Sequence, residues 1–389
     1  MMPLNAYSPT ASRAACKILR PSSFSSLLSS SSPLSSTLRL SSSASTPSCP
    51  LSYRSSPSKF GTIPLTNLKN PDLLYVVGGL YGNTNALSKI AHLASLESTP
   101  PTIIFNGDFN FFNVSPSSFH SINSAVLNGP HHVATAGNVE REISSSSSYI
   151  GCGCSYPSFV GEAVVSRSDD IVSRLHETCR NSEHHKALGE LPPYLKTVVG
   201  GKTVGVLHGD FHSLAGWSFA AEAMTPVDDD LHKALGVDGS FRVTSGEEVV
   251  EEFEEAGVDI VACTHTCLAF GQKFTSSKSN KDYVLFNSGS AGMSNFKSTT
   301  YGCITRISSP LSPLSPSVEA EVLYSTDLDG VNISALKVEF DNEGWREAFK
   351  TMWGEGSSAR LSYWERIKEG VGFWGLDQAA KKGVKLRGR

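Results

Sequence analysis

The sequence predicts an α/β fold built in layers, with β-strands at the centre and helices flanking them. Short apolar runs rich in Val, Ile, Tyr and Phe alternate along the chain with longer segments of helical character. Clusters of polar residues follow directly after several apolar runs, as they do where the strands of an α/β sheet end. The chain has 389 residues, 39% of them apolar, so it can bury a sizeable core.

The first half of the body alternates predicted strands with predicted helices. The apolar run LLYVV at 73–77 stops at a glycine pair, and an amphipathic segment at 83–97 follows it. Strands alternating with helices in this way predict a layered α/β domain. The same order recurs downstream, with strands predicted at 102–106, 131–137 and 158–165 and helices at 119–127 and 168–181.

The second half adds a hairpin, a capped helix and further strands. Gly200 and Gly201 lie between two apolar runs, which predicts a hairpin with a Gly-Gly turn. Ser245 and Glu248 form a capping box at the start of a helix that Gly257 ends. The strands predicted in this half are 195–199, 203–209, 259–265, 283–287 and 334–340.

The sequence predicts one domain over residues 72–305 and a C-terminal extension, 306–389, that packs on it. The extension opens with a Pro/Ser-rich loop at 308–317, which we expect at the surface. It also carries four of the five tryptophans. No basic groove accompanies them, so we expect packing residues rather than stacking platforms at Trp345, Trp353, Trp364 and Trp374.

The first 58 residues have an unusual composition. They are serine-rich, contain no acidic residue, and carry basic residues only at Arg13, Lys17, Arg20, Arg39 and Arg54. This composition is typical of an organelle transit peptide, and high serine with modest arginine favours a plastid (chloroplast) over a mitochondrion. A plain disordered tail has the same composition. We expect residues 1–58 to be a disordered transit peptide.

Charge and hydropathy exclude several classes of partner for the body of the protein. Without residues 1–58, the chain has 28 basic and 37 acidic residues, a net charge of about −9. A mildly acidic body argues against a nucleic-acid polymer or an anionic membrane as partner. No apolar run reaches the roughly 18 residues of a membrane span. The cysteines of the body show no zinc-finger spacing, and Cys152-Gly-Cys154 is too tight for a CxxC site.

Five short polar clusters follow predicted strands. A lone Gly-Asp or Gly-Asn after a strand is usually just a turn. Five in order at the ends of one sheet are hard to explain as turns, because strand ends converge and bring such side chains together. Their Asp, Asn and two His residues form a mixed oxygen and nitrogen shell that suits a divalent transition metal. The clusters are Gly107-Asp108-Phe109-Asn110, Gly137-Asn138-Val139-Glu140, His208-Gly209-Asp210, Thr264-His265-Thr266-Cys267 and Asn287-Ser288-Gly289-Ser290.

This order of motifs resembles the calcineurin-like metallophosphoesterase superfamily over roughly residues 72–305. The family's motifs are DxH, GDxx[DN], GNH[DE], a lone His after a strand, and GHxH. The resemblance implies a layered metallophosphoesterase-like β-sandwich flanked by helices. The family's first motif falls on residues 73–87, where Gly82-Asn83 match it. Gly79 stands where the family has Asp, and Tyr81 where it has His.

The family holds two metals that share one bridging Asp, here Asp108. The resemblance implies that the second metal is bound by Asp108, Asn138, His208 and His265, and all four are present. Of the ligands exclusive to the first metal, none remains, since Gly79, Tyr81 and Cys267 occupy those positions. We therefore expect one divalent ion (Mn, Fe or Zn) per chain. Each of the four ligands has an ordinary alternative, as a turn residue or as a histidine bonded to backbone.

Two functions follow from the resemblance. The first is a metal-dependent phosphoesterase, a hydrolase acting on a small phosphorylated substrate with one metal site lost. The second is an inactive pseudophosphatase that binds a phosphate or nucleotide ligand as a regulatory module. The family's proton-donating His falls on Val139, so no catalytic residue is assigned. Weak candidates for phosphate contacts are Asn83, Asn110 and His212. Protein partners are left unassigned.

Overall fold

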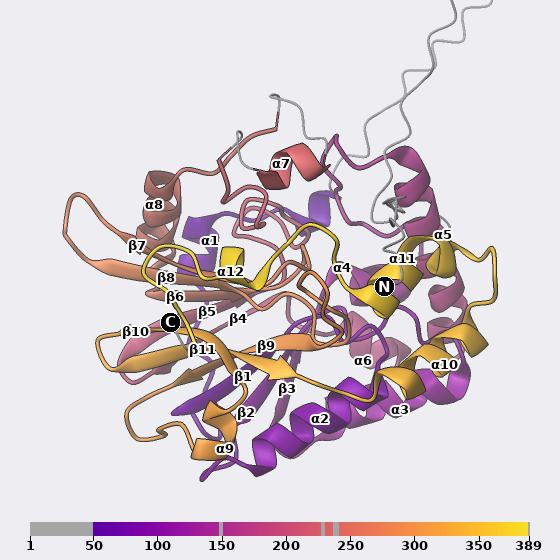
Figure 1. Ribbon diagram of the computed structural model, residues 1–389, viewed down its shortest axis with the longest axis horizontal. Coiled ribbons are helices and arrows are strands. Elements are labelled where there is room, and N and C mark those ends of the chain that lie inside the picture. The colour runs from indigo at the N-terminus through magenta and orange to yellow at the C-terminus, as the bar shows by residue number, and fades with distance from the viewer. Residues whose placement is uncertain (1–49, 148–150, 227–229, 236–240, 388–389) are drawn as a thin grey trace, which may run out of the picture.

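The computed structural model describes residues 50–147, 151–226, 230–235 and 241–387. Within these residues the strands form two sheets, one of seven strands and one of five, with helices on their outer faces (Figure 1). The predicted layered α/β sandwich flanked by helices is therefore confirmed. Most of the predicted transit peptide, residues 1–49, lies outside the described residues.

The seven-stranded sheet has a parallel half and an antiparallel half. Its strand order is β12-β10-β11-β9-β1-β2-β3. β1, β2 and β3 are parallel, whereas β9 joins β1 in antiparallel register and begins the antiparallel half. The strands are β1 Leu73–Val77, β2 Thr102–Asn106, β3 His132–Thr135, β9 Gly302–Ser308, β10 Val322–Leu328, β11 Val331–Val338 and β12 Lys385–Leu386.

The five-stranded sheet is parallel at its centre and antiparallel at both edges. Its strand order is β4-β5-β6-β8-β7, with β5, β6 and β8 parallel. The predicted hairpin joins β4 to β5, and Gly200 and Gly201 turn it with φ of 53° and 79°, which glycine adopts most readily. The strands are β4 Tyr194–Val199, β5 Lys202–Leu207, β6 Ile260–Cys263, β7 Phe270–Thr275 and β8 Asp282–Asn287.

The two sheets pack face to face, and each face of the seven-stranded sheet is buried. Leu74 and Val76 of β1 lie in the same apolar cluster as Val204 and Val206 of β5. The alternate residue Tyr75 belongs to a second cluster, between the seven-stranded sheet and its helices. Because successive side chains of a strand point to opposite faces, a continuous apolar run such as LLYVV supplies both clusters.

Helices cover the outer faces of both sheets (Figure 1). The second apolar cluster draws on α2, α3, α5, α10 and α11, with α2 and α3 next to the seven-stranded sheet, whereas α1 and α8 contribute to the first cluster. The helices are η1 Leu51–Tyr53, α1 Pro57–Gly61, α2 Thr84–Ser95, α3 Pro116–Asn128, α4 Asn138–Ile143, α5 Glu162–Arg180, α6 His185–Gly189, α7 Asp230–Leu235, α8 Gly246–Ala256, α9 Pro316–Glu319, α10 Asn342–Met352, α11 Ser358–Glu369 and α12 Leu376–Ala379.

The prediction of a strand at 158–165 is wrong. Helix α5 begins at Glu162 and includes Val164 and Val165, the pair that suggests a strand. Both valines lie in the first turn of the helix, away from the buried stripe that starts at Ser168. By contrast, the capping box of α8 is confirmed, and Gly257 ends that helix with φ 65°.

The C-terminal segment is part of the seven-stranded sheet. The predicted boundary between residues 305 and 306 falls inside β9, and β10 to β12 continue the sheet beyond it. Among the tail tryptophans, Trp345, Trp353 and Trp374 are buried, which confirms their packing role. No helix in the described part of the chain is both long and apolar enough to cross a membrane.

Residues 50–58, which fall within the predicted transit peptide, lie against the body. The ring of Tyr53 is buried, and its hydroxyl donates to Glu142 Oε1 at 2.5 Å. The same hydroxyl lies 3.4 Å from the carbonyl oxygen of Asn138. Further along, Phe60 of α1 is buried in the first apolar cluster. This N-terminal segment therefore contacts α4, the helix that begins at one of the predicted metal ligands.

Candidate metal centre

The four predicted ligands lie directly after the carboxyl ends of parallel strands. Asp108 follows β2, Asn138 is the first residue of α4 after β3, His208 follows β5, and His265 follows β6. Two of these strands belong to each sheet, so the site forms where the ends of both sheets meet. All four residues are at most 8% exposed.

The side chains of Asp108, Asn138 and His265 each place one potential ligand atom close to Nε2 of His208. Asn138 Oδ1 lies 3.1 Å from this nitrogen, His265 Nδ1 lies 3.2 Å from it, and Asp108 Oδ2 lies 3.4 Å from it. In a tetrahedral site with metal bonds of about 2.0–2.1 Å, ligand atoms stand roughly 3.3–3.4 Å apart. The three separations agree with this spacing. The structure therefore brings the four predicted ligands together at one point.

Hydrogen bonds on the outer side of the site fix which atoms face inward. His208 Nδ1 lies 2.8 Å from the carbonyl oxygen of Asn106, which can only accept, so this nitrogen carries the proton. Asn138 Nδ2 donates to the Cys152 carbonyl at 2.7 Å, and His265 Nε2 donates to the Cys154 carbonyl at 3.2 Å. These outer bonds leave Asn138 Oδ1 and His265 Nδ1 as inward-facing acceptors beside the Asp108 carboxylate, and a neutral His208 adds its Nε2 to them. Such outer partners are what orient metal ligands.

The electrostatics of the site favour a cation at its centre. Burial opposes ionisation of Asp108, but the neighbouring His208 holds the pKa of Asp108 below its ordinary value. Burial also disfavours a charged His208, yet the Asp108 carboxylate raises the pKa of His208. Burial, with His208 beside it, lowers the pKa of His265 to about 4, so His265 is neutral at pH 7. Without a metal, a protonated His208 is the positive partner of the buried Asp108 carboxylate, and a bound cation would take over that role and keep His208 neutral.

Glu140 positions Asp108 and was assigned no role from the sequence. Its carboxylate accepts from the backbone N–H of Asp108 at 2.7 Å and of Gly137 at 3.1 Å. Asp108 needs this support because its backbone is left-handed, with φ 52°. Burial, with Asp108 close by, raises the pKa of Glu140 to about 7. The sequence signal for this role is the GNxE motif, which puts a glutamate at the third position of α4.

Backbone atoms of the loop around Cys154 cover the site. The Cys154 carbonyl accepts from Trp217 Nε1 at 3.0 Å as well as from His265. The Trp217 ring lies 5.6 Å, between centroids, from the His265 ring. Asp210 holds the loop that carries Trp217, because its carboxylate accepts from the N–H of Ser218 at 2.9 Å. Side-chain patterns gave no signal for the two carbonyls or for Trp217.

The positions that the resemblance assigns to a first metal are filled by side chains that contact one another. The Tyr81 hydroxyl lies 2.6 Å from Cys267 Sγ. A Cβ atom added at Gly79 would lie 2.3 Å from the Tyr81 ring, so the ring occupies the space of any side chain there. Arg366 of α11 donates to the Cys267 carbonyl at 2.8 Å. Gly79, Tyr81 and Cys267 thus form a packed protein surface next to Asp108, whose carbonyl accepts from the Tyr81 N–H.

The three weak candidates for phosphate contacts have other roles. Asn83 caps α2 by accepting from Ala86 N at 3.1 Å, and it is fully buried. Asn110, also fully buried, bonds to Asn123 and Glu140. His212 is exposed and pairs with Glu252 at 2.8 Å. Protein groups hold all three side chains in this structure, and their contact with phosphate stays a prediction.

Comparisons with known proteins identify similar structures at low sequence identity. No family model and no curated relative matches the chain. A metallophosphoesterase from Sphaerobacter thermophilus is 13% identical, with 77% of this chain and 100% of that chain covered and a TM-score of 0.45. A hypothetical protein from Pyrococcus horikoshii is also 13% identical, with 77% and 98% covered and a TM-score of 0.47. A serine/threonine phosphatase from Saccharomyces cerevisiae is 14% identical, with 71% and 85% covered and a TM-score of 0.35.

Proposed function

We propose that this protein binds one divalent transition metal through Asp108, Asn138, His208 and His265 and hydrolyses a phosphate ester of a small substrate. One observation carries the proposal. Four potential ligand atoms converge with the spacing of a tetrahedral site, and outer hydrogen bonds orient Asn138, His208 and His265 toward its centre. Two imidazoles with two oxygens are a ligand set that suits Mn, Fe or Zn.

The residues of the site divide the chemical tasks. A bound divalent ion supplies Lewis acidity and lowers the pKa of a water molecule on it. Asp108 provides the negative charge that holds the ion, and Glu140 keeps the Asp108 backbone in place. The family's proton donor is replaced by Val139, so no protein group here protonates a leaving group at that position. We therefore expect hydrolysis that is slow, or restricted to esters with acidic leaving groups.

The test is metal quantification on the purified full chain together with a screen of phosphomonoester and phosphodiester substrates. The proposal expects a bound ion that His208→Ala removes, and hydrolysis that is lost with it. Binding of a metal without hydrolysis of any substrate would support the metal site and contradict the proposed enzymatic activity. Absence of a His208-dependent ion under metal-replete conditions would reject both.

A pseudophosphatase that binds a phosphorylated ligand is the second candidate. The observation that favours it is the contact between Tyr81 and Cys267, which replaces a second metal with protein packing. A two-metal site clamps both the attacking and the leaving oxygen, and a single metal cannot do both. This candidate expects ligand-dependent thermal stabilisation without turnover.

A further inference from the structure

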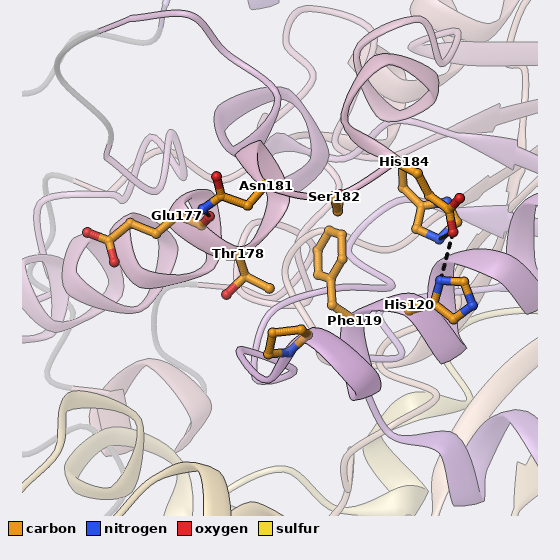
Figure 2. Close-up of a pocket in the computed structure, with 9 residues that line it drawn as sticks. Phe119, His120, Glu177, Thr178, Asn181, Ser182 and His184 are labelled. Atoms are coloured by element: carbon orange, nitrogen blue, oxygen red, sulfur yellow. Dashed lines mark hydrogen bonds and ion pairs between the residues drawn. The ribbon is translucent and has the colours of Figure 1, made fainter.

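A cavity of about 420 Å³ lies between α3 and the junction of α5 with α6. It shares no residue with the Asp108 centre. Figure 2 shows its lining, with His120 and His184 close together at one end and Glu177, Thr178 and Asn181 toward the other. Phe119 forms part of the wall. This cavity therefore has an apolar wall, and histidines gather at one end of it.

Three potential ligands meet at the histidine end of this cavity. Nδ1 of His120 lies 2.9 Å from Glu183 Oε1, and Nε2 of His184 lies 3.7 Å from the same oxygen. The three donor atoms all lie within 4.8 Å of one another. The two measured separations bracket the roughly 3.3–3.4 Å expected between ligands of a tetrahedral site with bonds of about 2.0–2.1 Å. The cluster is therefore already close to a metal-binding geometry.

Local contacts orient both imidazoles. Ser124 lies one turn after His120 on α3, and its Oγ is 3.4 Å from His120 Nε2. That contact satisfies Nε2 and leaves Nδ1 of His120 toward Glu183. His184 is buried directly before α6, and its Nε2 lies 3.3 Å from the same Ser124 Oγ. Glu183 is exposed and supplies one negative charge.

We propose that His120, Glu183 and His184 form a second, independent metal site that binds Zn²⁺ or a zinc-like ion. Two histidines and one glutamate make a three-ligand zinc set that leaves a fourth position for water or a small ligand. That position faces the cavity, which has room for a small anionic ligand. The ion ties α3 to the α5–α6 junction, segments about 60 residues apart. An exposed His–Glu ion pair alone would add little to stability and bind no metal.

The test is zinc binding by the full chain, measured by competition with a chromophoric chelator. The unmodified protein should bind two ions, and His120→Ala should bind one. His208→Ala removes the Asp108 centre and should also leave one ion, held by the His120 cluster. Adding His184→Gln to His208→Ala should weaken the binding of that remaining ion at least tenfold. The matched control is His185→Ala, since His185 neighbours the cluster but contributes no ligand.

A second measurement guards against misfolding. His120 is exposed, so His120→Ala should melt at the same temperature as the unmodified protein in chelator, and only the zinc-dependent rise in Tm should disappear. Zinc binding by His120→Ala and His184→Gln equal to that of His185→Ala would overturn the proposal. So would a His208→Ala protein that folds and binds no zinc. If the unmodified protein binds only one ion, and His120→Ala removes it while His208→Ala does not, the result would count against the proposed function and not against this site.

Discussion

The Tyr81 hydroxyl lies 2.6 Å from Sγ of Cys267, although 186 residues separate the two in sequence. Both residues have left-handed backbones, with φ of 54° and 62°. Such conformations are strained for side chains of this size and persist where the surrounding structure holds them. The two side chains therefore bond to each other at positions where the resemblance implies metal ligands. That relationship and the intact Asp108 centre lead to the predictions below.

Metal binding at the Asp108 centre depends on both histidines. His208→Ala or His265→Ala should remove the ion, because each deletes one of four ligands. Elemental analysis after dialysis measures the change, with His120→Ala as the background so that the second cluster does not contribute. His212→Ala is the matched control, since His212 is exposed and pairs with Glu252. An ion retained in His208→Ala would show that His208 is no ligand.

Binding of a metal at the first position implied by the resemblance should require substitutions at Gly79, Tyr81 and Cys267 together. Gly79→Asp alone places a side chain 2.3 Å from the Tyr81 ring and should destabilise the protein by about 1–3 kcal/mol. Gly79→Asp with Tyr81→His and Cys267→His removes that clash and restores the ligand set that the resemblance implies. Chemical denaturation of both variants, with metal counting, checks this. A single variant as stable as the triple variant would contradict the steric reason.

Glu140 should control metal affinity without touching the metal. Glu140→Gln puts a donor either opposite the N–H groups of Asp108 and Gly137 or opposite those of Asn110, so the loop from Asp108 to Asn110 loses an acceptor. We expect about 10- to 100-fold weaker metal binding, as for other residues that orient ligands. Competition titration measures it, with the exposed Glu162→Gln as control. An unchanged affinity would remove the positioning role.

Glu222 should make stability fall as pH rises. Burial raises the pKa of Glu222 to about 7 from 4.5, and its Oε2 has no hydrogen-bond partner among the described residues. Between these values the unfolded chain releases a proton that the folded chain keeps, so stability declines through pH 4.5–7 and stays lower above it. Glu222→Gln should be neutral near pH 4.5 and stabilising by about 1–3 kcal/mol at pH 8. Urea unfolding at both pH values, with the exposed Glu247→Gln as control, decides this.

We propose that the N-terminal segment directs the protein to plastids. A fusion of residues 1–70 to a fluorescent protein should enter them, because the first 58 residues are serine-rich and acid-free. Confocal imaging beside plastid and mitochondrial markers gives the result. Replacing three of the serine positions by glutamate should abolish import. Cytosolic or secretory fluorescence of the unmodified fusion would contradict the proposal.

Residues that follow strands explain why much of the candidate site could be predicted. The apolar runs define strand ends, and parallel strand ends meet, so Asp108, Asn138, His208 and His265 could be placed together before any contact was known. The strand β10 was missed although its burial alternates, because polar Ser325 and Asp327 interrupt its apolar pattern. Periodicity read over short windows does not separate such cases.

Other parts of the site leave no pattern in the sequence. The Cys152 and Cys154 carbonyls orient Asn138 and His265 through backbone atoms, which any residue possesses. Trp217 reaches the site from a loop with no periodic signal. The contact of Tyr81 with Cys267 depends on tertiary structure. The sequence shows only that these two residues stand where the family that it resembles has histidine. Roles that depend on backbone atoms or on tertiary contacts therefore become visible only in the folded structure.

The hydrogen bond from Tyr53 to Glu142 links the start of the folded chain to α4, which presents Asn138 at its first residue. A proteolytic cut between Tyr53 and Phe60 would remove the only hydroxyl that both reaches the Asn138 carbonyl and satisfies Glu142 within the described residues. The half-buried Glu142 carboxylate would then lose this hydrogen bond, at the cost of stability in the helix that presents Asn138. Cleavage of the proposed transit peptide a few residues earlier or later would therefore tune the proposed metal site irreversibly.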